Sequence, residues 1–336
     1  MKKSLLYLFT IICSLYFITA CSDDEKPVTW QDISKTYTGN QLDLGTSLIG
    51  SVGSVKLEAV SADKVNLVLT DILPGENEVT LSAILMKGGE SSSFPGDFII
   101  KGMATISTGE LTVNGYILKG ILKLDIVREM TSSVVGNWDL TIQDGKTADV
   151  FISVKGTPLD DLLNSMGPVV GQLLAQKVEK VSVLFGENGQ LVVGYKMPGS
   201  DAIDLPPAEI APVLVNLLTW YEKDGIVYIA ARKDIVDIIV ALIPKLSEID
   251  ITPYLSLLEL NGSFYVLPIH ATIEANNARL YVTKDFVQKV WPLIKTLIPA
   301  DSQYAFLLPI VDSAINSAQS IEIGLGFTTP CIIPAD

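Results

Sequence analysis

Between residues 30 and 132 the apolar positions alternate with polar ones in a repeat of two. Such alternation is typical of strands that turn one face to a core and the other to solvent. The clearest runs lie at 55–59, 65–69, 79–85 and 122–126, and segments rich in Gly, Pro, Asn, Asp or Ser separate the runs at 61–63, 73–77, 88–96 and 114–115. We therefore expect an antiparallel β-barrel or sandwich over residues 30–132.

After Val134 the pattern changes. A predicted strand pair at 138–142 and 149–154 leads to Thr157-Pro158-Leu159-Asp160, which has the capping Thr, early Pro and acidic first turn of a helix start. The apolar positions from 159 to 178 keep a repeat of 3.6. Because Gly167-Pro168 falls in the middle, this helix should kink or break in two.

Three predicted hairpins follow, with turns at 187–189, at Asp224-Gly225 and at Asn276-Asn277. These residues tolerate the positive φ of tight hairpins. A predicted helix follows each hairpin, at 207–218, 234–246 and 284–298, and a last helix at 302–318 precedes a strand at 321–327. Residues 133–336 are therefore expected to form an α+β domain of repeated β-hairpin–helix units, with helices against one sheet face.

The predicted helix at 234–246 is apolar nearly all round, and Asp237 and Lys245 are its main polar interruptions. Such a helix has to be covered on more than one side. Another protein layer, a lipid-like ligand or the membrane surface could cover it. The membrane is the least favoured, because the helix lacks the Lys and Arg face of interfacial helices. If the structure has an apolar cavity between the helices and the sheet, a lipid-like ligand is the favoured cover of this helix.

The composition of the chain excludes intrinsic disorder and one class of binding partner. The 336 residues are 48% hydrophobic and 18% charged, with a mean hydropathy of +0.39, which excludes intrinsic disorder. The 38 acidic and 24 basic residues give a net charge of −14. Binding to nucleic acid requires clustered Lys and Arg to displace counterions, so nucleic acid is excluded as a partner.

The N-terminus is typical of a secretory signal peptide over residues 1–20, with Lys2 and Lys3 before an apolar stretch. Ile18-Thr19-Ala20-Cys21 resembles the lipobox of bacterial lipoproteins, in which the chain is cut before a lipidated Cys. Lipidation is therefore expected at Cys21. The alternative is an uncleaved helical anchor, although the apolar stretch is shorter than the roughly 20 residues of a membrane span.

Residues 21–29 are expected to be a lipidated tether. Its acidic cluster, Ser22-Asp23-Asp24-Glu25, resembles the export signal that takes lipoproteins of the Bacteroides type to the cell surface. The resemblance implies a lipid-anchored protein of the outer membrane that faces the exterior, with a periplasm-facing location as the alternative. A plain solvated tether would have a similar composition.

No residue pattern assigns a catalytic, cofactor-binding or metal-binding site. The one histidine, His270, has no nucleophile-elbow Ser or Cys beside it in sequence, and His270 and Cys331 are too few to bind zinc. A catalytic pair of carboxylates remains a candidate, because the two carboxylates of glycosidases have no fixed spacing in sequence. The indoles that could bind sugars are Trp30, Trp138, Trp220 and Trp291; Trp220 and Trp291 are expected in the core.

The lipobox and acidic cluster, together with residues 36–42 (TYTGNQL) and 71–76 (DILPGE), resemble a domain-of-unknown-function family of Bacteroides-type outer-membrane lipoproteins. The first part of that family is similar to calycin or lipocalin-like barrels. The resemblance implies a location, a fold and, if the barrel closes, room for a small apolar ligand. It implies no activity.

We therefore expect a non-enzymatic, surface-anchored binding or assembly module of the outer membrane. Its expected partners are the membrane, through the N-terminal lipid, and a hydrophobic small molecule, a glycan or an envelope protein. No cofactor is expected. A carboxylate-dependent glycan hydrolase is the alternative function, and a purely structural role in the envelope is a third.

Overall fold

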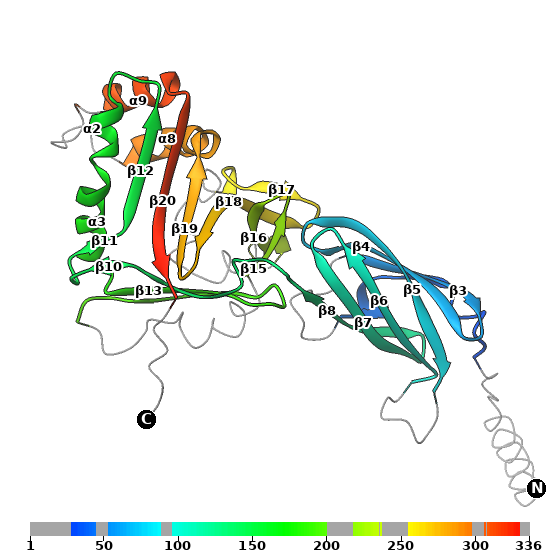
Figure 1. Cartoon of the computed structure of the whole chain (residues 1–336). Coiled ribbons are helices and arrows are strands. Elements are labelled where there is room, and N and C mark those ends of the chain that lie inside the picture. Colours follow the sequence, from blue (N-terminus) through cyan, green and yellow to red (C-terminus); the bar gives the residue numbers. More distant parts are fainter. Residues whose placement is uncertain are drawn as a thin grey trace, which may run out of the picture.

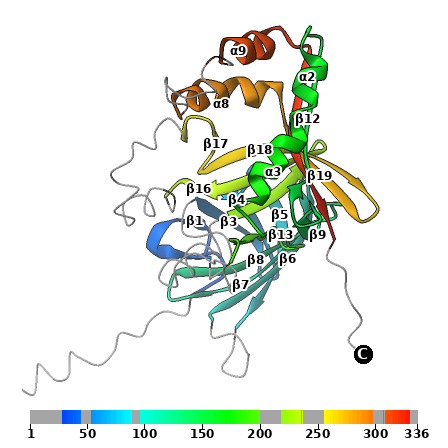
Figure 2. The ribbon, with the colours of Figure 1, turned by 90° about the vertical axis from the view of Figure 1, so that its left-hand side faces the viewer.

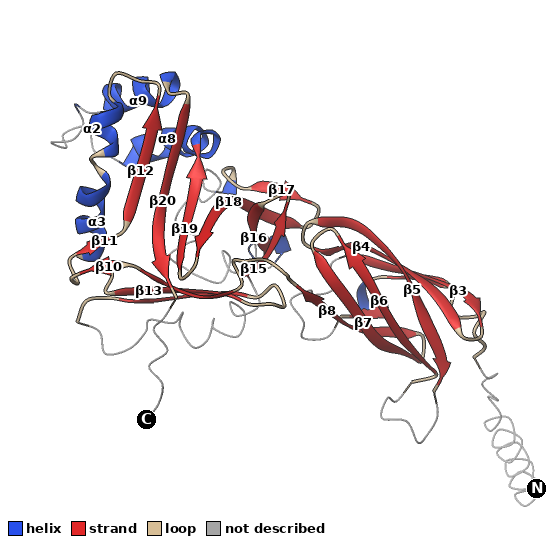
Figure 3. Cartoon of the chain, in the orientation of Figure 1, coloured by secondary structure: helices blue, strands red, loops and turns tan. Residues whose placement is uncertain are grey.

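The computed structural model describes residues 28–44, 53–88, 96–199, 218–234, 236, 255–297, 306 and 308–329. These residues form two large β-sheets that lie side by side and one two-stranded sheet, with the α-helices gathered on the second large sheet (Figures 1 and 3). Several predicted features lie outside the described residues: the signal peptide, Cys21, Cys331, most of the helix at 234–246, and the helix at 207–218 apart from Leu218, which begins β15.

The first sheet is a nearly closed barrel of eight strands in the order β1-β3-β4-β5-β6-β7-β8-β2. Only Thr38 and the short 3₁₀ helix η1 (Gly39–Gln41) separate β1 from β2, so one segment supplies both edges of the sheet. Strand β1 pairs with β3 in antiparallel fashion, and β2 pairs with β8 in parallel. The strands are β1 (Lys35–Tyr37), β2 (Leu42–Asp43), β3 (Ser54–Ser61), β4 (Lys64–Leu73), β5 (Glu76–Lys87), β6 (Phe98–Ile106), β7 (Gly109–Leu118) and β8 (Ile121–Glu129).

The inward positions of the barrel form one buried apolar cluster. Along β4, for example, Val65, Leu67 and Leu69 are each at most 2% exposed, whereas the residues between them face outward. Side chains from all eight strands and the segment before β1 meet in this cluster. The barrel interior is therefore a packed core, as in other small barrels whose side chains fill the space.

One predicted turn of the barrel is wrong. Asn114-Gly115 lies inside β7, and the turn that follows is at Lys119-Gly120, where both residues have positive φ. Gly115 lies where the backbone of β8 comes so close that only a glycine fits. A Cβ on Gly115 would lie 2.1 Å from the backbone oxygen of Lys123. This glycine allows a close backbone approach and does not mark a turn. The turn expected at 73–77 is confirmed at Pro74-Gly75.

Two buried tyrosines predict an alkaline limit to stability. Burial raises the pKa of Tyr37 and of Tyr221 from 10.0 to about 12. Unfolded tyrosines ionise near pH 10, so the unfolded state is favoured as the pH rises from 10 to 12, and below pH 10 this contribution is fully present. Between pH 10 and 12, each tyrosine should lower the free energy of unfolding by on the order of 2 kcal/mol. Denaturant titrations between pH 8 and 12 test this, and Tyr37→Phe should flatten the decline.

The second sheet has ten strands around the long C-terminal strand β20. Its main order is β14-β13-β9-β20-β19-β18-β16-β15, with β12 also paired to β20 and β17 to β18. Gln190 and Thr219 form an isolated bridge between the turn before β14 and strand β15, which brings the two ends of this sheet together. The strands are β9 (Gly136–Leu140), β12 (Val150–Lys155), β13 (Lys180–Phe185), β14 (Leu191–Lys196), β15 (Leu218–Lys223), β16 (Ile226–Arg232), β17 (Glu259–Asn261), β18 (Phe264–Glu274), β19 (Asn277–Thr283) and β20 (Ser320–Thr328).

The predicted strand pair at 138–142 and 149–154 is also wrong in its pairing. Strands β9 and β12 pair with β20 one after the other along its length, and not with each other. The residues between them form the small hairpin of β10 (Ile142–Gln143) and β11 (Thr147–Ala148). Strand β20 is long enough to bind both, which the local pattern could not indicate.

The helix expected at 157–178 breaks in two, as Gly167-Pro168 predicts. Its parts are α2 (Asp160–Asn164) and α3 (Gly167–Ala175), with Pro168 in the first turn of α3. The C-terminal helices are α8 (Lys284–Leu297) and α9 (Leu308–Ser317). Figure 2 shows α2, α8 and α9 together at one end of the second sheet and α3 in front of its strands.

The expected repeat of hairpin–helix units is not confirmed. All three hairpins are present, as β13–β14, β15–β16 and β18–β19. The third leads into α8, and the second leads into helical residues at 233–234 and 236, where the described part of the helix expected at 234–246 ends. The helix expected at 207–218 lies outside the described residues except for Leu218, which begins β15.

The two sheets meet around the guanidinium group of Arg128 on β8, which is 5% exposed. Its Nη1 donates to the backbone oxygen of Pro74 at 2.8 Å and to Thr108 Oγ1 at 3.3 Å, and its Nη2 donates to the backbone oxygen of Trp220 at 3.2 Å. Burial lowers the pKa of Arg128 to about 10, so it stays protonated at neutral pH. One charged side chain therefore joins the β4–β5 turn of the barrel to β15 of the second sheet.

Candidate functional site

The second sheet has one apolar and one polar face, and the strand period of two decides which residues belong to each. On β12, Val150, Ile152 and Val154 share the apolar face, and Phe151 and Ser153 share the other. On β20 the odd positions from 321 to 327 are Ile, Ile, Leu and Phe, and the even positions hold Glu322 and two glycines. The helices pack on the apolar face, where α2, α8 and α9 cover its end nearest Val154 and Ile321.

The part of the apolar face that these three helices leave open forms a groove of about 870 Å³. Its volume lies in the upper part of the roughly 300–1,000 Å³ typical of small-molecule sites. Strands β12, β19 and β20 supply its floor, α3 one wall, and β13 and β14 another. Its apolar lining comprises Val150, Val170, Leu173, Leu174, Val181, Val183, Phe185, Leu191, Val193, Ile229, Ile269, Leu280, Val282, Ile323, Leu325 and Phe327.

Two glycines decide where α3 lies. A Cβ on Gly167 would lie 2.5 Å from the backbone oxygen of Val150, and one on Gly171 would lie 2.2 Å from that of Ala148. The helix therefore packs directly against the β11–β12 backbone, at a sheet edge where β20 is the one described strand that pairs with β12. Because α3 lies along this edge, it forms one wall of the groove and does not lie across its floor.

The groove carries little charge. Among the described residues that line it, Gln176 and Lys177, just after α3, and Tyr281 are polar, and none is a carboxylate. Several walls are open to solvent, since Leu173 is 56% exposed and Val193 43%. An apolar surface of this extent is typical of a site that a ligand or partner covers.

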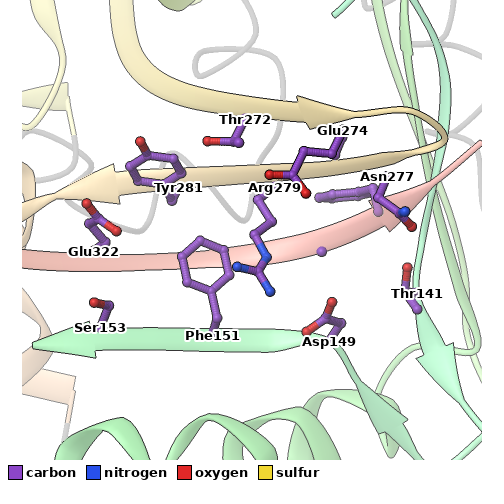
Figure 4. A pocket seen from close by; sticks show the side chains of 13 residues that line it. Thr141, Asp149, Phe151, Ser153, Thr272, Glu274, Asn277, Arg279, Tyr281 and Glu322 are labelled. Carbon is purple, nitrogen blue, oxygen red and sulfur yellow. The ribbon is translucent and has the colours of Figure 1, made fainter.

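The opposite, polar face of the same sheet holds a second cavity of about 480 Å³, shown in Figure 4. Three carboxylates line it, Asp149, Glu274 and Glu322, together with Arg279 and the rings of Phe151 and Tyr281. Adjacent strands lie about 4.8 Å apart and residues rise about 3.3 Å along a strand, so these carboxylates start about 13 Å or more from one another. They are spread around the cavity and do not start as a facing pair.

Most residues singled out in the sequence lie away from both cavities. His270 is on β18, where its ring stacks on that of Tyr281 at 5.4 Å. Trp138 and Trp220 are buried in the second sheet's core, and Trp291 is partly buried, with its Nε1 donating to Asp312 Oδ1 at 2.8 Å. Trp30 packs against the barrel core. Among the described residues, no group of three His, Cys, Asp or Glu could hold a metal ion.

Comparisons of the chain with protein-family models, curated proteins and solved structures found no match. Within the residues that the structure covers, no helix combines the length and apolar character of a membrane span. The candidate site is therefore defined by its own residues.

Proposed function

We propose that this protein binds an acyl chain or a similarly apolar ligand in the groove of its second sheet, and that it does so without catalysis. The observation that carries the proposal is the groove itself, whose lining is apolar except for Gln176, Lys177 and Tyr281. Transfer of an aliphatic chain from water to such a lining is favourable by about 0.8 kcal/mol for each CH₂ group buried. Buried cores such as the barrel interior offer no comparable open surface.

The ligand enters the groove lengthwise. The floor follows β19 from Leu280 to Val282 and β20 from Ile323 to Phe327, which pair side by side, so an extended chain has an apolar track along them. Lys177 is the one charged residue among the described residues that line the groove, and it is exposed, so its ammonium group suits a carboxylate or phosphate head group that stays in water. The proposed ligand is thus an anionic amphiphile.

Leu173→Glu should weaken binding of an acyl chain by roughly tenfold or more, because it places a carboxylate on the groove wall. Binding is measured by displacement of N-phenyl-1-naphthylamine with palmitate and dodecyl phosphate. Val169→Glu is the matched control: Val169 is on the same helix and 55% exposed, but it does not line the groove. Equal affinities of the two variants would contradict the proposed site.

We further propose that the protein acts as an outer-membrane lipoprotein that displays this groove at the cell surface. Support comes from the lipobox at Cys21 and the acidic cluster after it. The residues from Ser22 to Val28 would extend roughly 25 Å at most. Cys21→Ser should abolish incorporation of labelled palmitate and release the protein from the membrane fraction. Protease treatment of intact cells should degrade the wild-type protein if it faces outward and spare it if it faces the periplasm.

The alternative, a carboxylate-dependent glycan hydrolase, would use the polar cavity. Glycosidases place two carboxyl groups about 5 to 9.5 Å apart on either side of the scissile bond. Asp149 directly precedes β12, Glu274 is on β18 and Glu322 is on β20, and the three residues lie in different cross-strand rows. This arrangement favours separate hydrogen-bonding positions, and binding is the function that we propose.

A further inference from the structure

The polar cavity has an aromatic floor. Phe151 on β12 is opposite Gly324 on β20, and Tyr281 on β19 is opposite the same glycine. A Cβ on Gly324 would lie 2.8 Å from the Phe151 ring and 2.5 Å from Tyr281 Cβ, so the glycine leaves the space that the rings occupy. Figure 4 shows the ring of Phe151 face-on over β20. The ring of Phe151 is half-buried, and it meets that of Tyr281 edge to face at 5.9 Å.

Hydrogen-bonding groups surround this ring. The guanidinium carbon of Arg279 lies 5.2 Å from the Phe151 ring centroid. Asp149 lies over Gly326, the residue opposite Arg279, and a Cβ on that glycine would be 2.0 Å from Asp149 Oδ2. Ser153 and Glu322 face each other on the far side of Phe151. Glycines at two successive positions of one face of β20 thus let side chains from the strands on both sides extend across it.

Apart from the contact of Arg279 with the Phe151 ring, several of these polar groups have no polar partner among the described residues. Over the ranges that the structure describes, the side chains of Glu274, Asn277, Arg279 and Glu322 make no hydrogen bond or ion pair with another residue. Structural polar networks satisfy one another, whereas these groups keep their donors and acceptors for solvent or a ligand.

We infer that this cavity binds a neutral saccharide, with one sugar ring stacked on Phe151. The C–H groups on a pyranose face suit the negative face of an aromatic ring. Sugar hydroxyls both donate and accept, so they can donate to the carboxylates and accept from Arg279. Three carboxylates against one guanidinium give the lining a net charge of −2, which disfavours acidic sugars. The site lies on the opposite face of the sheet from the apolar groove, and Tyr281 and Phe327 are the lining residues that the two share among those described.

Isothermal titration calorimetry with the chain from Ser22 to Asp336 tests this inference. The ligands are six-unit gluco-, manno- and galacto-oligosaccharides and, as the acidic counterpart, an oligogalacturonate. At least one neutral oligosaccharide should bind, and the oligogalacturonate should bind at least about tenfold more weakly. Phe151→Ala and Arg279→Ala should each weaken binding of the neutral ligand by roughly tenfold or more, and Phe151→Trp should retain it.

Tyr195→Ala is the matched control for Phe151→Ala, since Tyr195 is an aromatic residue on β14, 40% exposed and outside the cavity. It should bind as the wild type does, and so should Leu173→Glu if the two sites are independent. Arg279 is exposed, so Arg279→Ala keeps the test valid should Phe151→Ala unfold. Absence of binding to every neutral oligosaccharide, tighter binding of the acidic one, or release of new reducing ends would overturn the inference.

Discussion

Arg128→Met is expected to separate the unfolding of the two sheets and to lower stability by about 3–5 kcal/mol. The substitution leaves the buried backbone oxygens of Pro74 and Trp220 without their donor. Hydrogen bonds from a charged group contribute about 1.5–3 kcal/mol each, and an orphaned buried acceptor adds a desolvation cost. Because these two oxygens lie on different sheets, their loss acts on the contact between the sheets more than on either core.

Scanning calorimetry measures this effect, with tryptophan fluorescence to follow the second sheet, where Trp138 and Trp220 are buried. We expect one main transition in the wild type and two resolved transitions in the variant. Lys223→Met is the matched control, because Lys223 also donates across the contact, to the backbone oxygen of Gly75 at 3.1 Å, but from a less buried position. Lys223→Met should lower the free energy of unfolding by about 1 kcal/mol. A single transition of Arg128→Met at the wild-type temperature would show that Arg128 does not couple the sheets.

Gly171→Val should displace α3, destabilise the protein by about 3 kcal/mol or more, and weaken acyl-chain binding by more than about tenfold. The new side chain would start 2.2 Å from the backbone oxygen of Ala148, which cannot move without disturbing β11. The helix has to shift away from the sheet edge. Leu173 and Leu174 move with it, so the groove loses a wall.

The same side chain on the next residue, Gln172→Val, is the matched control, because Gln172 is exposed on the outer side of α3. It should leave both stability and binding near wild-type values. Denaturant unfolding and dye displacement on the two variants give the comparison. If Gly171→Val bound palmitate as tightly as Gln172→Val, the position of α3 would not define the groove.

The local sequence pattern predicted where strands and helices lie better than it predicted which strands pair with each other. The alternation in residues 30–132 indicated the barrel strands, and Gly167-Pro168 indicated the break between α2 and α3, because both signals depend on residues close in sequence. The pairing of β9 and β12 depends on β20, which lies more than 160 residues further along the chain. The turn predicted at Asn114-Gly115 is wrong because the sequence alone does not distinguish a glycine that allows two strands to approach closely from a glycine that forms a turn.

The cavities were harder to predict, since each combines residues that only the sheet brings together. The expectation of an apolar cavity between helices and sheet came from the helix at 234–246, whereas the groove is walled by α3. The polar cavity had a signal that the sequence analysis missed. Gly324 and Gly326 alternate with apolar residues in β20, and glycines at i and i+2 put both gaps on one face of a strand. Arg128 gave no local sign of its role, because its acceptors lie 54 and 92 residues away.

The central claim is that an acyl chain lies in the groove of the second sheet, and photo-crosslinking with a diazirine-bearing palmitate tests it most directly. After irradiation and digestion, mass spectrometry locates the modified residues. We predict adducts on α3, β19 and β20, which unlabelled palmitate suppresses and Leu173→Glu reduces. Adducts confined to the barrel strands, or labelling that excess palmitate does not reduce, would contradict the account.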